Sequence, residues 1–344
     1  MKHSYLGAIH IHSKYSDGRK DVGFIIKKAA QAGLKWIIIT DHNNLKAKEH
    51  EGFHNGVCVI AGSEITPPTA NHLLAFGINE PIDYEIGAKN YIDEVHKQGG
   101  ICFVAHPDES INRDNKQSPL RWEDWSIDTF DGLEIWNYLT DWTDRYSVHK
   151  SVTWQFLFRH KNATGPTKNV LAWWDRLNLS KDYIVPALGG IDAHAFGFRK
   201  LNAPFRISDY YDFFMALNNV LYLDEPLSND FDEAKSQIIS AIKSASMTLI
   251  NRKVSKNTNI EYYVADKEKR IYSGESGVVG NYAKIIFKIP QKATVRLIHN
   301  GVIIYERETK ILEYDNVQNG KYRIEVYKNS TPWIFTNPIK IITQ

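Results

Sequence analysis

The sequence predicts an α/β domain followed by a small antiparallel β-sandwich. Over the first two thirds of the chain, short apolar runs alternate with amphipathic helical stretches, which is the pattern of parallel strands joined by crossover helices. Beyond this region the composition shifts to Val, Ile, Thr and Tyr alternating with charged residues, which is typical of half-buried strands. We therefore expect one domain over residues 1–246 and a second over residues 247–344.

The first domain contains six apolar runs of strand length. In order they are LGAIHIH at 6–12, WIIITDH at 36–42, VCVIAGSE at 57–64, ICFVAH at 101–106, LEIWN at 133–137 and VPALGGIDAH at 185–194. Two amphipathic stretches between these runs, 21–33 and 84–98, end at or beside glycine, a common residue at the end of a helix. This alternation of strand and helix is why we predict the α/β class.

The second domain carries turn signals of the kind that join antiparallel strands. A helix-like stretch at 232–245 closes the first domain before this region begins. Asn300-Gly301 then lies between two alternating runs in TVRLIHNGVIIYER, and this dipeptide is a strong hairpin signal. Asn319-Gly320 precedes the further strand-like run KYRIEVYKN.

Bulk composition limits the class of partner and the compartment. With 42 Lys and Arg against 40 Asp and Glu, the net charge of +2 does not predict binding of polymeric nucleic acid, but it permits a small anionic substrate. Cys58 and Cys102 lie in apolar runs, which favours buried free thiols and a cytoplasmic location. The chain has no apolar run of about 18 residues, so we expect no membrane helix.

The positions of the ionisable residues in the sequence indicate a functional site. Five separate apolar runs end in or beside a histidine or a carboxylate: His10 and His12, Asp41 and His42, Glu64, His106, and Asp192 and His194. His10 and His12 are two apart on a strand, so both rings project from one face. In a parallel barrel the ends of all these strands meet at one rim, where active sites lie. The sequence therefore predicts one polar cluster.

Such a cluster predicts bound metal. Packing several carboxylates and imidazoles together is costly without cations, because like charges repel and burial removes water. Histidine and carboxylate ligands without cysteine suit Zn, Mn or Fe(II), and several carboxylates favour more than one ion. We expect His72, which precedes the apolar run LLAF, to be a ligand or a substrate contact. Asp17, in Ser-Asp-Gly, is either a turn residue or a ligand.

The other polar residues give weaker signals. Glu134 and Asn137 flank the apolar centre of LEIWN, and either support the site, contact substrate or form a satisfied polar pair. Four further histidines stand in a helix, in a polar loop and in the second domain, and we interpret them as bystanders: His50, His54, His96 and His299.

The motifs HIHSKYSDG, TDHN, GSE, AHP and GIDAH, in that order over residues 7–194, resemble those of the PHP (polymerase and histidinol phosphatase) family. The C-terminal YRIEVY and PWIFTNPI are similar to the tail of a subgroup that includes carbamate-hydrolysing relatives. The resemblance implies a distorted seven-stranded, TIM-like (β/α) barrel with two or three divalent metal ions at its rim.

The resemblance also implies a ligand set. Carried over by motif, the first ion is held by His10, His12, Glu64 and Asp192, the second by Glu64, His72 and His106, and the third by Asp17, His42 and His194. Glu64 would bridge the first two ions. Many trinuclear relatives have histidine where this chain has Asp17, so the third site departs from their pattern.

The activity that this implies is hydrolysis of a small phosphomonoester or nucleotide phosphoester by a hydroxide that bridges two ions. We expect the catalytic groups to be Glu64, Asp41, Asp192 and His194, with Asp41 in a supporting position behind the ligand His42. We expect the substrate contacts to be Lys14, Arg113, Glu134, Asn137 and Arg199. One alternative is a carbamate or ester hydrolase on the same metal centre. Another, of a different class, is a non-catalytic protein that binds its partner through the β-sandwich.

Overall fold

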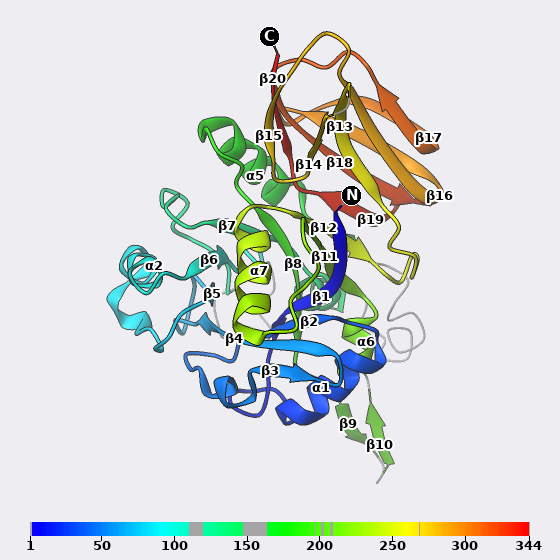
Figure 1. The fold of residues 1–344 in the computed structure, drawn as a ribbon. Coiled ribbons are helices and arrows are strands. Elements are labelled where there is room, and N and C mark those ends of the chain that lie inside the picture. Colours follow the sequence, from blue (N-terminus) through cyan, green and yellow to red (C-terminus); the bar gives the residue numbers. More distant parts are fainter. Residues whose placement is uncertain are drawn as a thin grey trace.

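Seven strands in the first part of the chain close into a barrel (Figure 1). The computed structural model describes residues 2–109, 120–146, 164–195, 197–200, 203–206, 209–267 and 269–343. Around the barrel the strands are β1 (His3–Ile11), β2 (Trp36–Ile39), β4 (Val57–Ile65), β5 (Leu73–Phe76), β6 (Ile101–Val104), β7 (Gly132–Asn137) and β8 (Ala187–Ala193), which pairs again with β1. The predicted α/β class and seven-stranded barrel are confirmed.

The barrel is irregular in direction and in register. Six strands run parallel, whereas β5 runs antiparallel to both β4 and β6. The strand prediction from apolar runs omitted β5, which has only four residues and is joined to β4 without a crossover helix. Register shifts interrupt the pairing of β8 with both β1 and β7. These irregularities lie beside the residues of the polar cluster.

Helices cover the outside of the barrel in the pattern that the sequence predicts. Helix α1 (Val22–Gln31) begins at Asp21, whose side chain accepts from the backbone N–H of Phe24, and it buries an apolar stripe against the strands. The predicted helix at 84–98 is divided at Gly87, where φ is 87°, into the 3₁₀ turn η2 (Tyr84–Ile86) and α2 (Ala88–Lys97). The others are α3 (Tyr138–Tyr146), α5 (Lys168–Ser180), α6 (Tyr210–Phe214) and α7 (Phe231–Lys243).

The C-terminal strands form a β-sandwich around their own buried apolar cluster. They are β13 (Glu261–Asp266), β14 (Lys269–Tyr272), β15 (Ser276–Val279), β16 (Lys284–His299), β17 (Val302–Tyr314), β18 (Gly320–Lys328), β19 (Thr331–Thr336) and β20 (Ile339–Thr343). Asn300 and Gly301 join β16 to β17 with φ values of 51° and 80°, the left-handed pair that a tight hairpin requires. One pair, β15 with β20, is parallel rather than antiparallel.

One sheet runs from the barrel wall into the sandwich. The first residues of β1 pair with β11 (Leu217–Leu223), whereas its last residues pair with β8. From β11 the sheet continues through β12 (Met247–Asn251) to β19. The side chain of Asn337 bonds both the N–H and the C=O of Ala187, at the start of β8. The change of architecture at our proposed boundary, residue 246, is therefore bridged by continuous hydrogen bonding.

Some short elements lie outside this plan. β3 (Gly52–His54) pairs beside β4, and η1 (Lys46–His50) follows β2. The β9–β10 hairpin (Gly197–Lys200 and Ala203–Arg206) projects from the end of the barrel opposite the sandwich (Figure 1). Cys58 and Cys102 are buried free thiols, as predicted. Within the described residues, the search for a helix long and apolar enough to cross a membrane finds none.

Candidate metal centre

The ends of the barrel strands bring the predicted ligands to one place, although they come from distant parts of the chain. Three groups of His, Asp and Glu could each surround an ion: His10, His12 and Asp192; His10, Glu64 and His106; and His12, Asp17, His42 and His194. The expectation that these side chains meet at one rim therefore agrees with the geometry.

Glu64, near the end of β4, lies at the middle of the cluster and is 1% exposed. Its Oε1 is 3.0 Å from His72 Nδ1 and 3.1 Å from His106 Nε2. Its Oε2 is 3.3 Å from His10 Nε2, 3.4 Å from His12 Nε2 and 3.0 Å from His42 Nδ1. The two oxygens of one carboxylate thus face different sets of imidazoles, which is the arrangement of a bridging ligand.

Asp192, near the end of β8, completes the group on the side of β1. Its Oδ1 lies 3.6 Å from His10 Nε2 and 3.3 Å from His12 Nε2. His10 and His12 project to the same side, as their spacing predicts, with ring centroids 5.1 Å apart. The strand is not regular there, because His10 has a φ of 67°.

Asp17 lies in the turn that follows β1, and its side chain reaches the cluster from there. Its Oδ1 lies 3.0 Å from His194 Nε2 and 3.4 Å from His42 Nε2. Its side chain is 59% exposed, whereas the other carboxylates of the cluster are buried. Asp17, His42 and His194 therefore form the edge of the cluster that faces water.

Three of the candidate ligands have a strained backbone. His10, His106 and Asp192 have φ values of 67°, 27° and 49°, a region that residues other than glycine seldom adopt. Such conformations cost roughly 1–3 kcal/mol each and persist where surrounding structure enforces them, commonly at functional sites. In each case the unusual φ accompanies a side chain that points into the cluster.

The hydrogen bonds of His72 test whether a cation fits. Its Nε2 lies 3.1 Å from the carbonyl oxygen of Pro67, so Nε2 must carry the proton that is donated. Burial lowers the pKa of His72, which favours a neutral ring with a bare lone pair on Nδ1. In that form Nδ1 and the carboxylate of Glu64 are two acceptors 3.0 Å apart, and a cation between them would relieve this contact.

Other buried nitrogens lead to the same conclusion. His10 Nε2, both ring nitrogens of His12 and His106 Nδ1 are buried without a hydrogen-bond partner. Burial, reinforced by His194, lowers the pKa of His12 to about 3, so this ring is neutral at pH 7 and has a nitrogen lone pair that can bind a metal ion. A neutral imidazole and an ionised carboxylate are the forms that bind divalent metals. The residues present fit a metal centre.

Charge balance in the cluster favours ionised carboxylates. Burial alone would raise the pKa of Glu64, but His10 and His42 outweigh it and hold that pKa well below its usual value. The same competition, with His10 and His194 as the cations, holds the pKa of Asp192 well below its usual value. Both carboxylates are therefore available as anionic ligands at neutral pH.

Glu134 and Asn137 support the ligands. Glu134 Oε1 accepts from His10 Nδ1 at 2.7 Å, and Oε2 accepts from the backbone N–H of His106 at 2.7 Å. Asn137 Nδ2 donates to Glu134 at 3.0 Å and to Asp192 at 3.4 Å. Glu134 thus holds a proton on Nδ1 of His10, so that Nε2 is the nitrogen that would bind an ion once the ion displaces its proton. Of the roles left open for this pair, direct support of the site agrees best with these contacts.

Asp41 bonds the loop after β1. Its carboxylate accepts from the N–H of Ser13 at 2.7 Å and from the hydroxyls of Ser13 at 2.7 Å and Ser16 at 2.6 Å. None of the ligand groups formed by the described residues includes it. These contacts agree with the expected supporting position of Asp41 beside His42, and they hold the loop after β1, which carries Asp17.

The predicted phosphate contacts are placed only in part. Lys14 is exposed in the loop after β1. Arg113 and the side chain of Arg199 lie outside the described residues.

Two supporting residues were not predicted. Glu109 Oε2 lies 3.5 Å from Nδ1 of His106, and Thr66 Oγ1 lies 2.7 Å from Nδ1 of His42. Glu109 is buried, although it stands in the charged run HPDE, which reads as surface loop. Its position three residues after a candidate ligand was the available signal.

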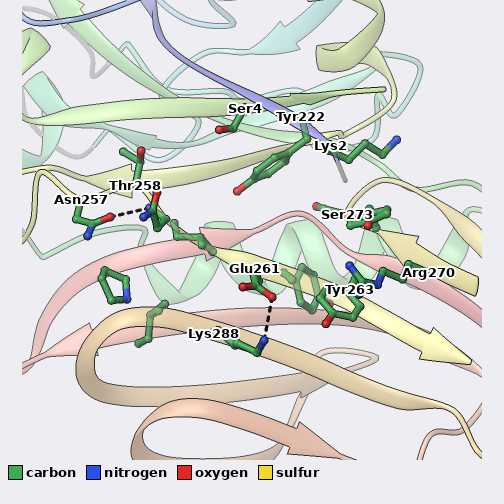
Figure 2. A pocket seen from close by; sticks show the side chains of 16 residues that line it. Lys2, Ser4, Tyr222, Asn257, Thr258, Glu261, Tyr263, Arg270, Ser273 and Lys288 are labelled. Atoms are coloured by element: carbon green, nitrogen blue, oxygen red, sulfur yellow. Dashed lines mark hydrogen bonds and ion pairs between the residues drawn. The ribbon is translucent and has the colours of Figure 1, made fainter. Parts of the chain in front are cut away.

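Two cavities bear on where a ligand could bind. A small one, about 70 Å³, adjoins the cluster at His106 and Asn137 and is lined further by Thr140, Asp141 and Thr164. A larger one, about 610 Å³, lies where the barrel meets the sandwich (Figure 2). Two of the cations that line it, Lys2 and Lys288, are paired with carboxylates, Lys288 with Glu261 at 3.1 Å. None of the candidate metal ligands, all of them among the described residues, lines the larger cavity, so it is not part of the candidate metal centre.

Comparison with known proteins gives a family match. The family model described as PHP domain matches residues 8–315, well beyond the 7–194 span of the sequence motifs. An uncharacterised protein of Methanocaldococcus jannaschii is 29% identical over 145 residues, which cover 38% of this chain and 80% of that protein.

Three solved structures are also similar. A two-domain protein containing a predicted PHP-like metal-dependent phosphoesterase from Bacteroides vulgatus has a TM-score of 0.44 at 14% identity, covering 98% of this chain and 95% of that one. PsfC from Pseudomonas syringae has a TM-score of 0.43 at 12% identity, covering 72% and 91%. A proposed metal-dependent phosphoesterase from Bifidobacterium adolescentis has a TM-score of 0.34 at 16% identity, covering 67% and 95%. These likenesses add nothing to what the family match shows.

Proposed function

Because this chain belongs to the PHP domain family, we propose that its cluster binds two or three divalent cations and hydrolyses a small phosphomonoester or a nucleotide phosphoester. Zn, Mn and Fe(II) all suit a set of histidine and carboxylate ligands. The general function, metal-dependent hydrolysis, is supported by the family and by the ligand groups together.

The observation that carries the proposal is the position of Glu64. Its two oxygens address His72 and His106 on one side and His10, His12 and His42 on the other. A carboxylate used in this way can hold two ions at once, which is the arrangement used to stabilise both attacking and leaving oxygens in phosphoryl transfer.

When bound, such ions lower the pKa of a water molecule and offset the negative charge that a phosphoryl group gains in the transition state. The chain's own residues prepare this chemistry. Glu134 holds His10 by Nδ1, so that Nε2 points at Glu64 and Asp192. His194 Nδ1 donates to the carbonyl oxygen of Asp192 at 2.9 Å, which leaves its Nε2 facing Asp17. Each imidazole is thus fixed in orientation before substrate arrives.

Substrate is proposed to approach from the edge formed by Asp17, His42 and His194, where the side chains of Asp17 and His42 are 59% and 27% exposed. Glu64, at 1% exposed, lies behind that edge. Lys14, Arg113 and Arg199 remain our proposed contacts for the phosphate group.

The test is a metal-loaded hydrolysis assay on the full chain. Purified protein reconstituted separately with Zn, Mn and Fe(II) is offered phosphomonoesters, nucleotides, aryl carbamates and aryl esters. We expect phosphate release that EDTA abolishes and that Glu64→Gln removes, while Glu51→Gln, a carboxylate bonded to Lys235 away from the cluster, retains it.

Two other outcomes would replace this function. EDTA-sensitive hydrolysis of carbamates or esters without phosphate release would give the same centre a different substrate class. Fewer than about one ion per chain after gentle purification and reconstitution, with no hydrolysis of any compound, would favour the binding-protein alternative.

A further inference from the structure

A second group of potential metal ligands lies away from the cluster described above. His96 is in the last turn of α2, Cys102 is the second residue of β6, and Asp131 immediately precedes β7. They therefore meet at the starting ends of β6 and β7. The candidate metal centre lies at the opposite ends of these strands, where His106 follows β6.

The three side chains are close enough to share an ion. His96 Nε2 lies 2.9 Å from Asp131 Oδ2 and 3.8 Å from Cys102 Sγ, and one donor atom from each residue lies within 4.8 Å of the others. Zinc binds sulfur, imidazole nitrogen and carboxylate oxygen at about 2.0–2.3 Å, so two donors on one tetrahedral ion lie roughly 3.3–3.7 Å apart. One observed distance lies just below that range and the other just above it, so small side-chain movements would place the three donors on one ion.

We propose that His96, Cys102 and Asp131 form a peripheral site for a borderline-soft divalent cation, with Zn²⁺ as its physiological occupant. The donor set selects for this class, because a thiolate favours zinc over the hard cations Mg²⁺ and Ca²⁺. One thiolate and one carboxylate also balance the charge of the ion. This changes the interpretation of His96, which the sequence alone presents as a bystander in an amphipathic helix.

A reactive thiol is the first competing explanation for the same group. Cys102 is fully buried, and burial, reinforced by Asp131, raises its pKa well above the usual value. A thiol in that state is a poor nucleophile and a poor oxidation sensor. A hydrogen-bonded His96–Asp131 pair beside a packed thiol, with no ion, is the remaining alternative and is the one that the experiment must separate.

Binding can proceed from solvent with a simple proton balance. The side chains of His96 and Asp131 are 36% and 18% exposed, so an ion can reach them from outside the barrel. On coordination the thiol of Cys102 loses its proton to solvent, and the imidazole keeps one proton, on Nδ1, so that Nε2 can bind. The ion would link the end of α2 to β6 and to the segment before β7.

Cobalt substitution tests the proposal directly. Co²⁺ replaces Zn²⁺ in such sites, and a sulfur ligand gives an intense near-ultraviolet charge-transfer band that nitrogen and oxygen ligands do not give. The chain has only two cysteines, both outside the candidate metal centre, so this band reports on the peripheral site even when both sites are filled. We expect the band in the full-length wild-type chain and in Cys58→Ser, and its loss in Cys102→Ser.

A second pair of variants covers the case in which Cys102→Ser does not fold. His96→Gln changes a half-exposed side chain, and His54→Gln is its control, an exposed histidine outside the ligand groups of the described residues. We expect His96→Gln to weaken the zinc affinity of this site about tenfold or more and to lower bound zinc by one ion per chain, with His54→Gln unchanged.

No band in cobalt-saturated wild-type protein, or a band that survives Cys102→Ser, would overturn the proposal. Equal zinc content in wild type and His96→Gln would also do so. None of these readouts uses hydrolysis, so they are independent of whether the proposed phosphoesterase activity is found.

Discussion

The carboxylate of Glu134 occupies the space beside Gly190 that any other residue's side chain would need. A Cβ at Gly190 would lie 1.6 Å from Glu134 Oε1, the atom that accepts from His10 Nδ1. Gly190 has no unusual φ, so its role is to provide space rather than backbone freedom. The glycine of one strand therefore determines whether a histidine of the neighbouring strand is correctly held.

Replacing Gly190 by alanine should reduce metal binding more than stability. The methyl group must displace Glu134, which frees the ring of His10, and loss of such support typically weakens metal affinity about 10–100-fold. Metal content and affinity, measured by elemental analysis and competitive titration, check this expectation. Gly189→Ala is the matched control, because the atoms nearest to its Cβ, at 3.0–3.2 Å, belong to the side chains of Leu217 and Leu249 and not to Glu134. Equal metal affinity in both variants would contradict the prediction.

Asp17→Asn should distinguish two ions from three. Asp17 contacts His42 and His194 at the exposed edge and does not contact Glu64. We expect the variant to lose one ion per chain and keep the others, because Glu64 and Asp192 are unchanged. The stoichiometry at metal saturation, measured by elemental analysis, tests this. Unchanged stoichiometry would mean that Asp17 only orients His194.

Metal binding should release protons, and the affinity should rise with pH. Burial alone would lower the pKa of His106, but Glu64 and Glu109 raise it to about 9 in the metal-free chain. Below pH 9 an ion must displace that proton, so the metal affinity should fall as the pH is lowered, by up to about tenfold per pH unit for each proton displaced. Calorimetry at pH 7 in buffers of different ionisation enthalpy counts the protons. A count of zero would contradict the prediction.

Arg323→Met should destabilise the junction between the barrel and the sandwich. The guanidinium of Arg323 on β18 bonds both oxygens of Asp175 on α5, at 2.8 and 2.7 Å, and Glu325 at 2.6 Å. These three side chains are largely buried, so removing the guanidinium leaves the carboxylates of Asp175 and Glu325 buried without a counter-ion. The change should lower the free energy of unfolding by roughly 3–5 kcal/mol.

Chemical denaturation measures this change, and Arg296→Met is its control. Arg296 pairs with Glu306 at the surface, where such a pair contributes roughly 0–1 kcal/mol. If the triple variant Asp175→Asn, Glu325→Gln, Arg323→Met regains stability, the loss in Arg323→Met comes from the carboxylates left without a counter-ion. A loss of unfolding free energy in Arg323→Met no larger than that in Arg296→Met would exclude this explanation.

The sequence predicts most of the barrel because its strands are buried on both faces and read as unbroken apolar runs. It misses β5, since the expected pattern was of parallel strands joined by helices, whereas β5 follows β4 without a helix and runs antiparallel to it. The hairpin at Asn300-Gly301 is predictable because its signal is local: both residues adopt the left-handed conformation that the turn requires.

The candidate ligands are predictable as a group because they end strands, and strand ends share a rim. The role of Glu134 is not, since it depends on a partner 124 residues away and on the space left by Gly190. The contacts of Asp41 could not be predicted for a related reason. Adjacency to His42 in the sequence does not reveal that its carboxylate turns toward Ser13 and Ser16.

The divided pairing of β1 has a consequence for the order of folding. Its partners β8 and β11 begin at Ala187 and Leu217, so both are distant from β1 in the sequence. His10 and His12 reach their final positions beside Asp192 only when β8 pairs with β1, and the formation of such long-range contacts is slow. We expect a refolding chain to acquire its ions late, after the barrel has closed.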